Sequence, residues 1–339
     1  MRCLDYSQTI SNHGQYESKW ILGSAKTDLL WFYLPALLLV SIGISIKVGH
    51  WPLLSSYEFV VLILLDVGHT FSTNWRTYFR KEEFNRRKEI YMILPIVFFS
   101  AAAYIAISPN GVRNIANAML IIVPFHGIQQ SYGILKWYQR KNGVFRPWSD
   151  RFFHALHLMP FSYLIYVNPA WNQFAIKIPM LLAKDSVSTL IGTLNVFAIF
   201  AYLIYEIILW QTSREWNRIL ITLFSALLLN GAIVMPNPME FTLAFKIFHA
   251  VAYFAIISAS TKRIWPLLEK GNIFKAPSKF TLIFYCSIPA MLIYPIQKMN
   301  DSLWGPLAIG FLFGNFCLHV AYDSFLWKRT NPDAAIIYG

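Results

Sequence analysis

The sequence predicts an all-α fold, a polytopic transmembrane helix bundle of about ten spans. Of its 339 residues, 56% are hydrophobic and only 14% are charged. Long apolar runs recur from residue 28 to residue 324, and no polar block between them is large enough to form a separate soluble domain. Basic residues gather in alternate connecting loops. We therefore expect a tail at 1–27, one transmembrane helical domain at 28–324 and a second tail at 325–339.

Each expected span is an apolar segment of the right length. A bilayer core of about 30 Å needs about 20 apolar residues per helix. Turn residues separate several of the segments: Pro109-Asn110-Gly111 and Pro236-Asn237-Pro238 are expected to be short reversals. The ten expected spans are 28–47, 54–72, 90–108, 115–135, 151–168, 186–210, 217–236, 241–261, 280–297 and 305–324.

The distribution of basic residues predicts the orientation. The 73–89 loop holds six Lys or Arg, and the loops at 136–151 and 262–279 hold five each, whereas the 236–240 reversal has none. Under the positive-inside rule the basic loops face the cytoplasm, and with an even number of spans both termini lie there too. The formal charge of +12 then reflects topology and attraction to anionic headgroups. We expect a multi-pass protein of a bacterial inner membrane that needs no nucleic acid.

Ionisable residues inside the spans indicate where function lies, because polar groups at this depth are costly. Six of the eight histidines lie in or at the edge of expected spans. Polar residues three or four apart share one helical face, which lipid does not accept, so the face points into the bundle or toward the interface. The paired positions are Asp66 with His69, His126 with Gln130, His154 with His157, and His319 with Asp323.

These side chains predict a metal centre. With the orientation above, all the paired histidines fall in the cytoplasmic half of their spans, and His249 lies nearer the middle. Helix-borne histidines with carboxylate partners are how bundle cores hold iron or zinc. Five imidazoles and two carboxylates at one depth exceed the three ligands of a catalytic zinc, which favours iron and leaves room for two ions. The candidate metal ligands are His69, His126, His154, His157, His249 and His319, with Asp66, Gln130 and Asp323 as catalytic or supporting residues.

Other interpretations stay open at this point. Intramembrane His and Asp residues also line proton pathways, so a proton-coupled secondary transporter is the main alternative. Two histidines can hold a haem, and His154 with His157 can form an interfacial pair that touches headgroups. Single buried histidines are often structural. A transporter should carry polar residues along its whole depth and show an inverted repeat, whereas here the polar residues gather on one side and no repeat is evident.

Histidines near the cytoplasmic ends of hydrophobic helices resemble the membrane-bound non-haem iron oxygenases. These include the fatty-acid desaturases and hydroxylases and the bacterial membrane β-carotene dioxygenases. The strings that carry the resemblance are HALH at 154–157 and PFHGIQQSYG at 124–133, where Gln130 stands in place of a second histidine. Neither string reproduces the motifs of those families. The membrane zinc hydrolases of the ceramidase and adiponectin-receptor type are a further comparison, without their HxxxH. The resemblance implies an iron-dependent, oxygen-using enzyme acting on an apolar lipid or isoprenoid.

Overall fold

Helices are the only regular secondary structure in the described part of the chain. The computed structural model describes residues 19–38, 41, 65, 67–167, 184–211, 213–234, 238–264, 278–297 and 302–327. No strand occurs among these residues, so the all-α prediction is confirmed for them. The elements are α1 (Ala25–Asp28), η1 (Leu29–Tyr33), α4 (Gly68–Ser72), η3 (Thr73–Trp75), α5 (Lys81–Arg86), α6 (Lys88–Ile107), α7 (Gly111–Lys141), α8 (Pro147–Val167), α10 (Lys184–Trp210), α11 (Trp216–Val234), α12 (Pro238–Ile264), α13 (Lys279–Gln297) and α14 (Trp304–Leu326).

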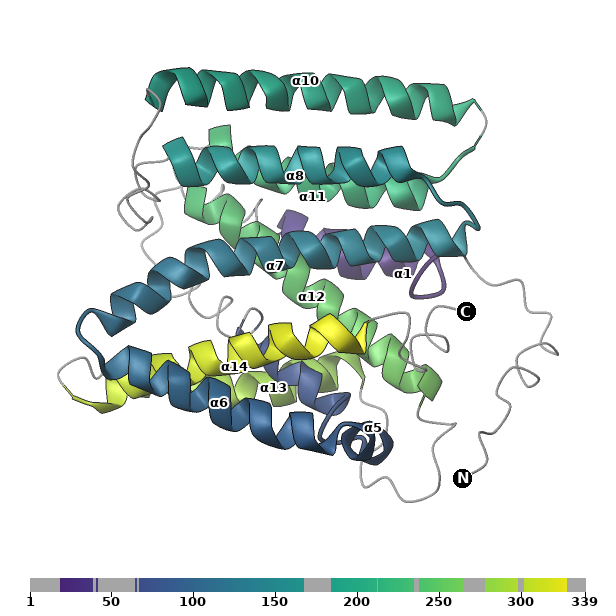
Figure 1. Cartoon of the computed structure of the whole chain (residues 1–339). Helices are drawn as coiled ribbons and strands as arrows, with labels where there is room; N and C mark the ends of the chain where they lie inside the picture. Colours follow the sequence, from purple (N-terminus) through teal and green to yellow (C-terminus); the bar gives the residue numbers. More distant parts are fainter. Residues whose placement is uncertain are drawn as a thin grey trace.

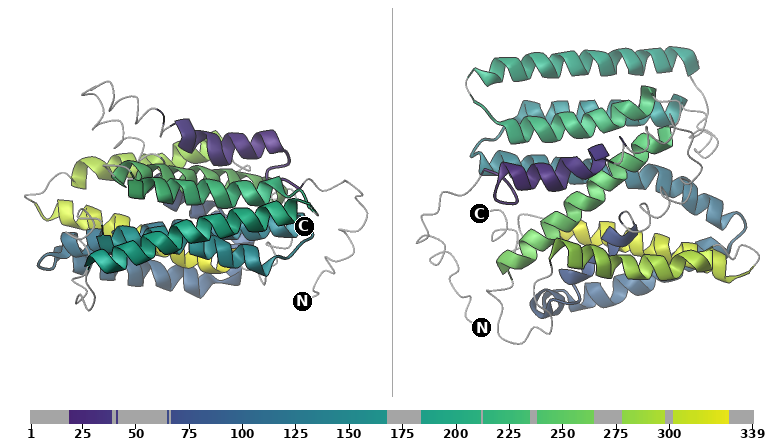
Figure 2. Two further views of the ribbon diagram at one scale, coloured as in Figure 1. Left: turned by 90° about the horizontal axis from the view of Figure 1, so that it is seen from above. Right: turned by 180° about the vertical axis from the view of Figure 1, so that it is seen from behind.

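The long helices lie side by side, and one helix crosses them. In Figure 1, α10 forms one edge of the molecule, α8 and α11 lie next to it, and α6, α13 and α14 form the opposite edge. Helix α7 runs between these two groups. Helix α12 crosses obliquely from the α11 side to the α14 side, as both Figure 1 and Figure 2 show. A residue on α12 can therefore meet residues from both groups, and this crossing positions the candidate site.

Among the helices of the described residues, four are long and apolar enough to cross a membrane, namely α6, α7, α10 and α14. Their bounds lie within a few residues of the expected spans 90–108, 115–135, 186–210 and 305–324. Many of their apolar side chains point outward, including Ile96 at 68% exposure and Phe197 at 71%. Exposed apolar surface on this scale is characteristic of contact with lipid or a partner. These helices indicate a membrane protein.

The expectation of about ten spans is not supported. The expected span at 54–72 lies largely outside the described residues, and the span at 28–47 does so in part. Helix α11 begins at Trp216, and the two residues that follow, Asn217 and Arg218, are both buried and hydrogen-bonded. High hydropathy alone therefore does not establish that a segment crosses the membrane.

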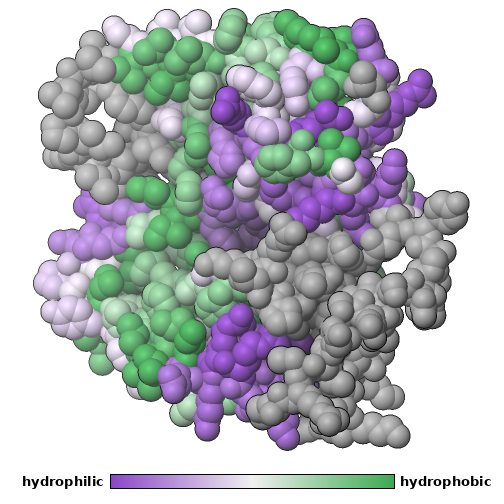
Figure 3. Space-filling view, turned by 45° about the vertical axis from the view of Figure 1, so that its right-hand side comes forward, coloured by the Kyte–Doolittle hydropathy of each residue, from purple (hydrophilic) through white to green (hydrophobic). Residues whose placement is uncertain are grey.

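The ends of the helices alternate in a way that gathers the basic loops. In Figure 1, α6 begins, α7 ends, α8 begins and α10 ends on the right-hand side of the molecule. Exposed basic residues, such as Lys81, Arg140 and Arg214, lie close to these helix ends. When this side is turned forward, hydrophilic side chains gather on the face, and hydrophobic ones dominate the top and the lower left (Figure 3).

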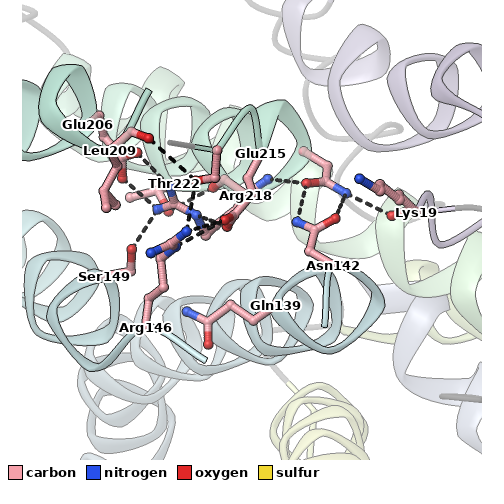
Figure 4. Close-up of polar contacts among 12 residues, drawn as sticks. Lys19, Gln139, Asn142, Arg146, Ser149, Glu206, Leu209, Glu215, Arg218 and Thr222 are labelled. Atoms are coloured by element: carbon pink, nitrogen blue, oxygen red, sulfur yellow. Dashed lines mark hydrogen bonds and ion pairs between the residues drawn. The ribbon is translucent and has the colours of Figure 1, made fainter. Parts of the chain in front are cut away.

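A polar network ties α8, α10 and α11 together near that end (Figure 4). Both terminal nitrogens of the Arg218 guanidinium donate to the Glu206 carboxylate on α10, each at 2.6 Å, and its Nε donates to Glu215 at 2.8 Å. Arg146 donates to Glu215 from Nε and Nη2, and Arg218 also donates to Ser149. Because the acids and bases are matched, this network is complete in itself and fixes the helices around it.

Small residues let α14 approach α6 closely. A Cβ atom at Gly310 would lie 2.9 Å from the Ala102 carbonyl oxygen, and one at Gly314 would lie 2.8 Å from a ring atom of Phe99. Close backbone approach at glycine is common between membrane helices, because packing rather than water exclusion drives their association. The contact fixes the position of α14, which carries His319 and Asp323.

Candidate metal centre

Four histidines from four helices meet inside the protein. They are His69 on α4, His126 on α7, His249 on α12 and His319 on α14. None is more than 8% exposed. Each reaches the centre because its helix is packed against α12 or α14: α4 and α7 both contact these two helices. We call these four side chains the histidine cluster.

The imidazole rings face one another through their Nε2 atoms. The Nε2 atoms of His69 and His249 are 2.9 Å apart, and those of His126 and His319 are 3.1 Å apart. The rings pack edge to face around a closed circuit, with centroid separations of 4.6 to 5.0 Å. Two nitrogens bound to one zinc ion at about 2.0–2.1 Å lie roughly 3 Å apart when they are neighbours. The observed separations match that spacing.

A carboxylate lies beside the cluster on the same helix as His319. The Oδ2 atom of Asp323 is 3.7 Å from Nε2 of His319 and 3.9 Å from Nε2 of His126. Its other oxygen, Oδ1, accepts hydrogen bonds from the Tyr253 hydroxyl at 2.5 Å and from Nε1 of Trp327 at 3.1 Å. Asp323 is therefore held with Oδ2 directed toward the histidine nitrogens.

The side of His319 away from the cluster is fixed by Thr73. The Thr73 hydroxyl is 2.7 Å from His319 Nδ1 and 3.0 Å from the Tyr253 hydroxyl. When Nδ1 carries the proton and donates to Thr73, the Nε2 lone pair points into the cluster. Such outer contacts orient metal-ligating histidines and set their tautomer.

The donor atoms fit one metal ion. Two overlapping sets have their ligand atoms within 4.8 Å of one another: His69, His249 and His319, and His126, His319 and Asp323. Both sets use His319. Its Nε2 has one lone pair, and Thr73 occupies its Nδ1 side, so it can serve one ion at a time. Nitrogen and carboxylate donors suit iron or zinc. A shared ligand therefore argues for a single ion rather than the two that the number of histidines allowed.

The other predicted metal ligands lie elsewhere. His157 is fully buried, with its Nδ1 2.7 Å from the Phe153 carbonyl and its Nε2 2.7 Å from the Ser225 hydroxyl on α11. His154 has its Nδ1 2.7 Å from the Asp150 carbonyl and packs against Tyr132. The structure thus does not bring this pair to the cluster.

Of the three predicted catalytic or supporting residues, two lie in or beside the centre. Asp323 lies in the centre. Gln130 lies beside it and donates a hydrogen bond at 2.9 Å to the backbone carbonyl of His249, which ties α7 to α12. Asp66 lies outside the described residues.

Three partners of the centre were not predicted, although each lies four residues after a candidate ligand in the sequence. Thr73 follows His69 by four residues, Tyr253 follows His249 by four, and Trp327 follows Asp323 by four. Residues four apart share a face on a helix. Searching one turn beyond each candidate ligand would have found all three.

A cleft of about 330 Å³ leads to the centre. Helix α12 forms its floor with Tyr253 and Ile256, and α7 and α14 form its walls. Its described lining is mostly apolar and aromatic, and includes Ile122, Phe125, Ile134, Trp137, Val320 and Trp327. At its inner end lie His126 and Asp323. The centre is therefore reached through an apolar space.

The fold and the site together define a helical membrane protein with a buried histidine cluster beside an apolar cleft. Comparisons with protein-family models, with curated proteins and with solved structures find no match to this chain.

Proposed function

We propose that the protein is a membrane metal-dependent oxidoreductase that uses one non-haem iron ion to oxidise an apolar lipid or isoprenoid. The observation that carries this proposal is the convergence of four buried histidine Nε2 atoms beside an apolar cleft that one of them, His126, lines. A metal with a purely structural role needs no such cleft, and the apolar walls of the cleft do not suit a water-soluble substrate.

Iron is favoured over zinc by the task that the cleft implies. Because the described lining is mostly apolar, it suits a substrate whose reacting group is a C–H or C=C bond rather than an ester or amide. No side chain alone attacks such a bond, whereas bound iron supplies dioxygen activation. Zinc would instead supply a bound water of lowered pKa for hydrolysis.

The chain's own residues have defined tasks under this proposal. His69, His126, His249 and His319 would hold the ion, and His126 also lines the cleft. Asp323 places a negative charge and a proton acceptor beside it. Tyr253 holds Asp323 in place through the hydrogen bond to Oδ1. The apolar walls exclude water and align the substrate.

The basic loops support an orientation for this site. We place the ends of α7 and α10 and the starts of α6 and α8 at the cytoplasmic face of a bacterial inner membrane, because these ends carry the basic connecting segments. With this orientation both chain termini lie in the cytoplasm.

The test is conversion of extracted membrane lipids by the purified protein under air and under nitrogen. The proposal expects conversion under air alone, and its loss on treatment with an iron chelator. Equal conversion in both atmospheres would replace the oxygenase with a zinc hydrolase. If no lipid is converted in either, the oxidoreductase proposal fails, and a proton-coupled transporter becomes the better account of the buried His and Asp residues.

A further inference from the structure

The cleft beside the histidine cluster has an open side. Phe125, Gln129 and Gly133 line it at successive turns of α7, and all three are exposed. Ser324, on α14, lines it as well and is exposed too. Since α7 and α14 are both candidate membrane spans, an opening between them along their length faces the lipid rather than water.

The charge along the cleft selects against ionic groups. Among the described residues that line it, Asp323 is the only acid and none is Lys or Arg. An anionic headgroup would be repelled by Asp323, and none of the described lining side chains is a Lys or Arg that would compensate the cost of moving its charge out of water. The other polar side chains are neutral amides and hydroxyls, such as Gln129, Gln130 and Ser324.

The size of the cleft limits what enters. An apolar cavity of roughly 150 Å³ binds one benzene molecule. The volume of about 330 Å³ is a little more than twice that, which corresponds to a chain segment on the order of ten carbon atoms. A whole membrane lipid does not fit, but part of its hydrocarbon chain does.

We propose that the gap between α7 and α14 is a lateral portal through which an uncharged hydrocarbon chain enters from the bilayer, and that Gly133 keeps it open. The headgroup stays outside, and the chain segment reaches His126 and Asp323. This inference rests on the proposed function, because it names the route and the chemical class of substrate for the same site.

A substitution at Gly133 offers the clearest test of the portal. A Cβ atom added there would meet nothing within 4 Å. A larger side chain at this position therefore starts in open space at the lining of the cleft. Glycine also lowers the stability of a helix interior relative to other residues, so its replacement should not weaken α7.

Gly133→Trp is the blocking variant, and Gly192→Trp is its matched control. Gly192 lies on α10 at the far edge of the molecule (Figure 1), and the nearest atom to a Cβ there is Tyr163 Cε2 at 4.0 Å. The probes are two neutral diazirine-bearing lipids in phosphatidylcholine vesicles that contain the full-length protein, one with a fatty-acyl chain and one with an isoprenoid chain. Peptide mass spectrometry maps the crosslinks, and metal content is measured on the same samples.

The proposal expects crosslinks on the cleft segments of α7 and α12 in the unaltered protein. Gly133→Trp should reduce them at least tenfold, while Gly192→Trp leaves them unchanged and both variants keep their metal. Whichever probe labels the cleft identifies the chain as acyl or isoprenoid. Labelling that Gly133→Trp does not reduce, or that avoids the cleft with both probes, overturns the portal. Cleft labelling of a protein that binds no metal would leave the portal standing and remove the oxidoreductase.

Discussion

At the scale of single residues, burial decides what the histidine cluster can do. Each imidazole is shielded from water, so its nitrogens need partners inside the protein. His319 has Thr73 on one side and His126 on the other, and Asp323 is held by Tyr253 and Trp327. Within each pair of facing Nε2 atoms one proton can be shared, whereas a bound cation would accept the lone pairs of both pairs together.

The Glu215 carboxyl gives a prediction about pH. Burial alone would raise its pKa, but the hydrogen bonds and charges of Arg146 and Arg218 outweigh burial and lower the pKa below the ordinary value of 4.5. A carboxyl whose pKa is lower in the folded state stabilises the fold above pH 4.5, and this contribution is lost as the pH falls through the lowered pKa. We expect Glu215→Gln to cost about 2 kcal/mol of stability at pH 7.

Thermal unfolding of the detergent-solubilised protein checks this. The difference in Tm between Glu215→Gln and the unaltered protein should be largest at pH 7 and should shrink as the pH drops below 4.5. Glu89→Gln, which alters an exposed carboxyl at the start of α6, serves as the control and should have little effect. A Tm difference for Glu215→Gln that stays constant down to pH 3 would show that the ion pairs do not stabilise the fold.

The residue patterns predicted part of the centre. Helical spacing placed Asp323 with His319 on one face, and it also placed His154 with His157 on one face of α8. It could not tell which neighbour each face meets. His157 meets Ser225 of α11 through its Nε2, and its Nδ1 is hydrogen-bonded to the Phe153 carbonyl. Both of its nitrogens therefore already have partners. His249, which the sequence pattern did not pair with another candidate ligand, is in the cluster because α12 crosses the other helices.

At the scale of elements, the packing of α14 on α6 controls the geometry of the centre. A Cβ at Gly310 would lie 2.9 Å from both the Ala102 carbonyl oxygen and the Ala106 Cβ. A larger residue there must push the two helices apart, and overpacking of this kind typically costs about 1–3 kcal/mol. The displaced helix carries His319 and Asp323, so the centre should loosen with it.

Gly310→Leu should therefore lower the Tm by several degrees and reduce the bound metal per chain. Gly192→Leu, on the loosely contacted face of α10, should change neither. Both are measured by unfolding in detergent and by elemental analysis. If Gly310→Leu behaves like Gly192→Leu, the close approach of α6 and α14 does not set the position of His319.

The bounds of apolar helices were easier to predict than their environment. The sequence indicated α6, α7, α10 and α14 to within a few residues, because long apolar runs and turn residues define helix ends locally. It did not distinguish a helix that faces lipid from one that is covered by others, since both are apolar. That difference depends on neighbours distant in the chain, such as the α10 carboxylate of Glu206 that pairs with Arg218.

At the scale of the whole molecule, the crossing of α12 joins two halves. The α8, α10 and α11 group is fixed by its own ion pairs (Figure 4), and the α6, α13 and α14 group is fixed by close backbone contacts. The histidine cluster lies where α4, α7, α12 and α14 meet. Because its four ligands come from four helices, the site exists only in the folded bundle, and metal binding should stabilise the whole fold.

The most direct test of the central claim is the iron and zinc content of the purified protein and of three variants. We expect about one ion per chain in the unaltered protein and in His157→Ala, whose imidazole lies between α8 and α11. In His126→Ala and His249→Ala most of the metal should be lost, because each removes one nitrogen of the cluster. A metal-free unaltered protein, or a His157→Ala variant that loses as much metal as His126→Ala, would contradict the account.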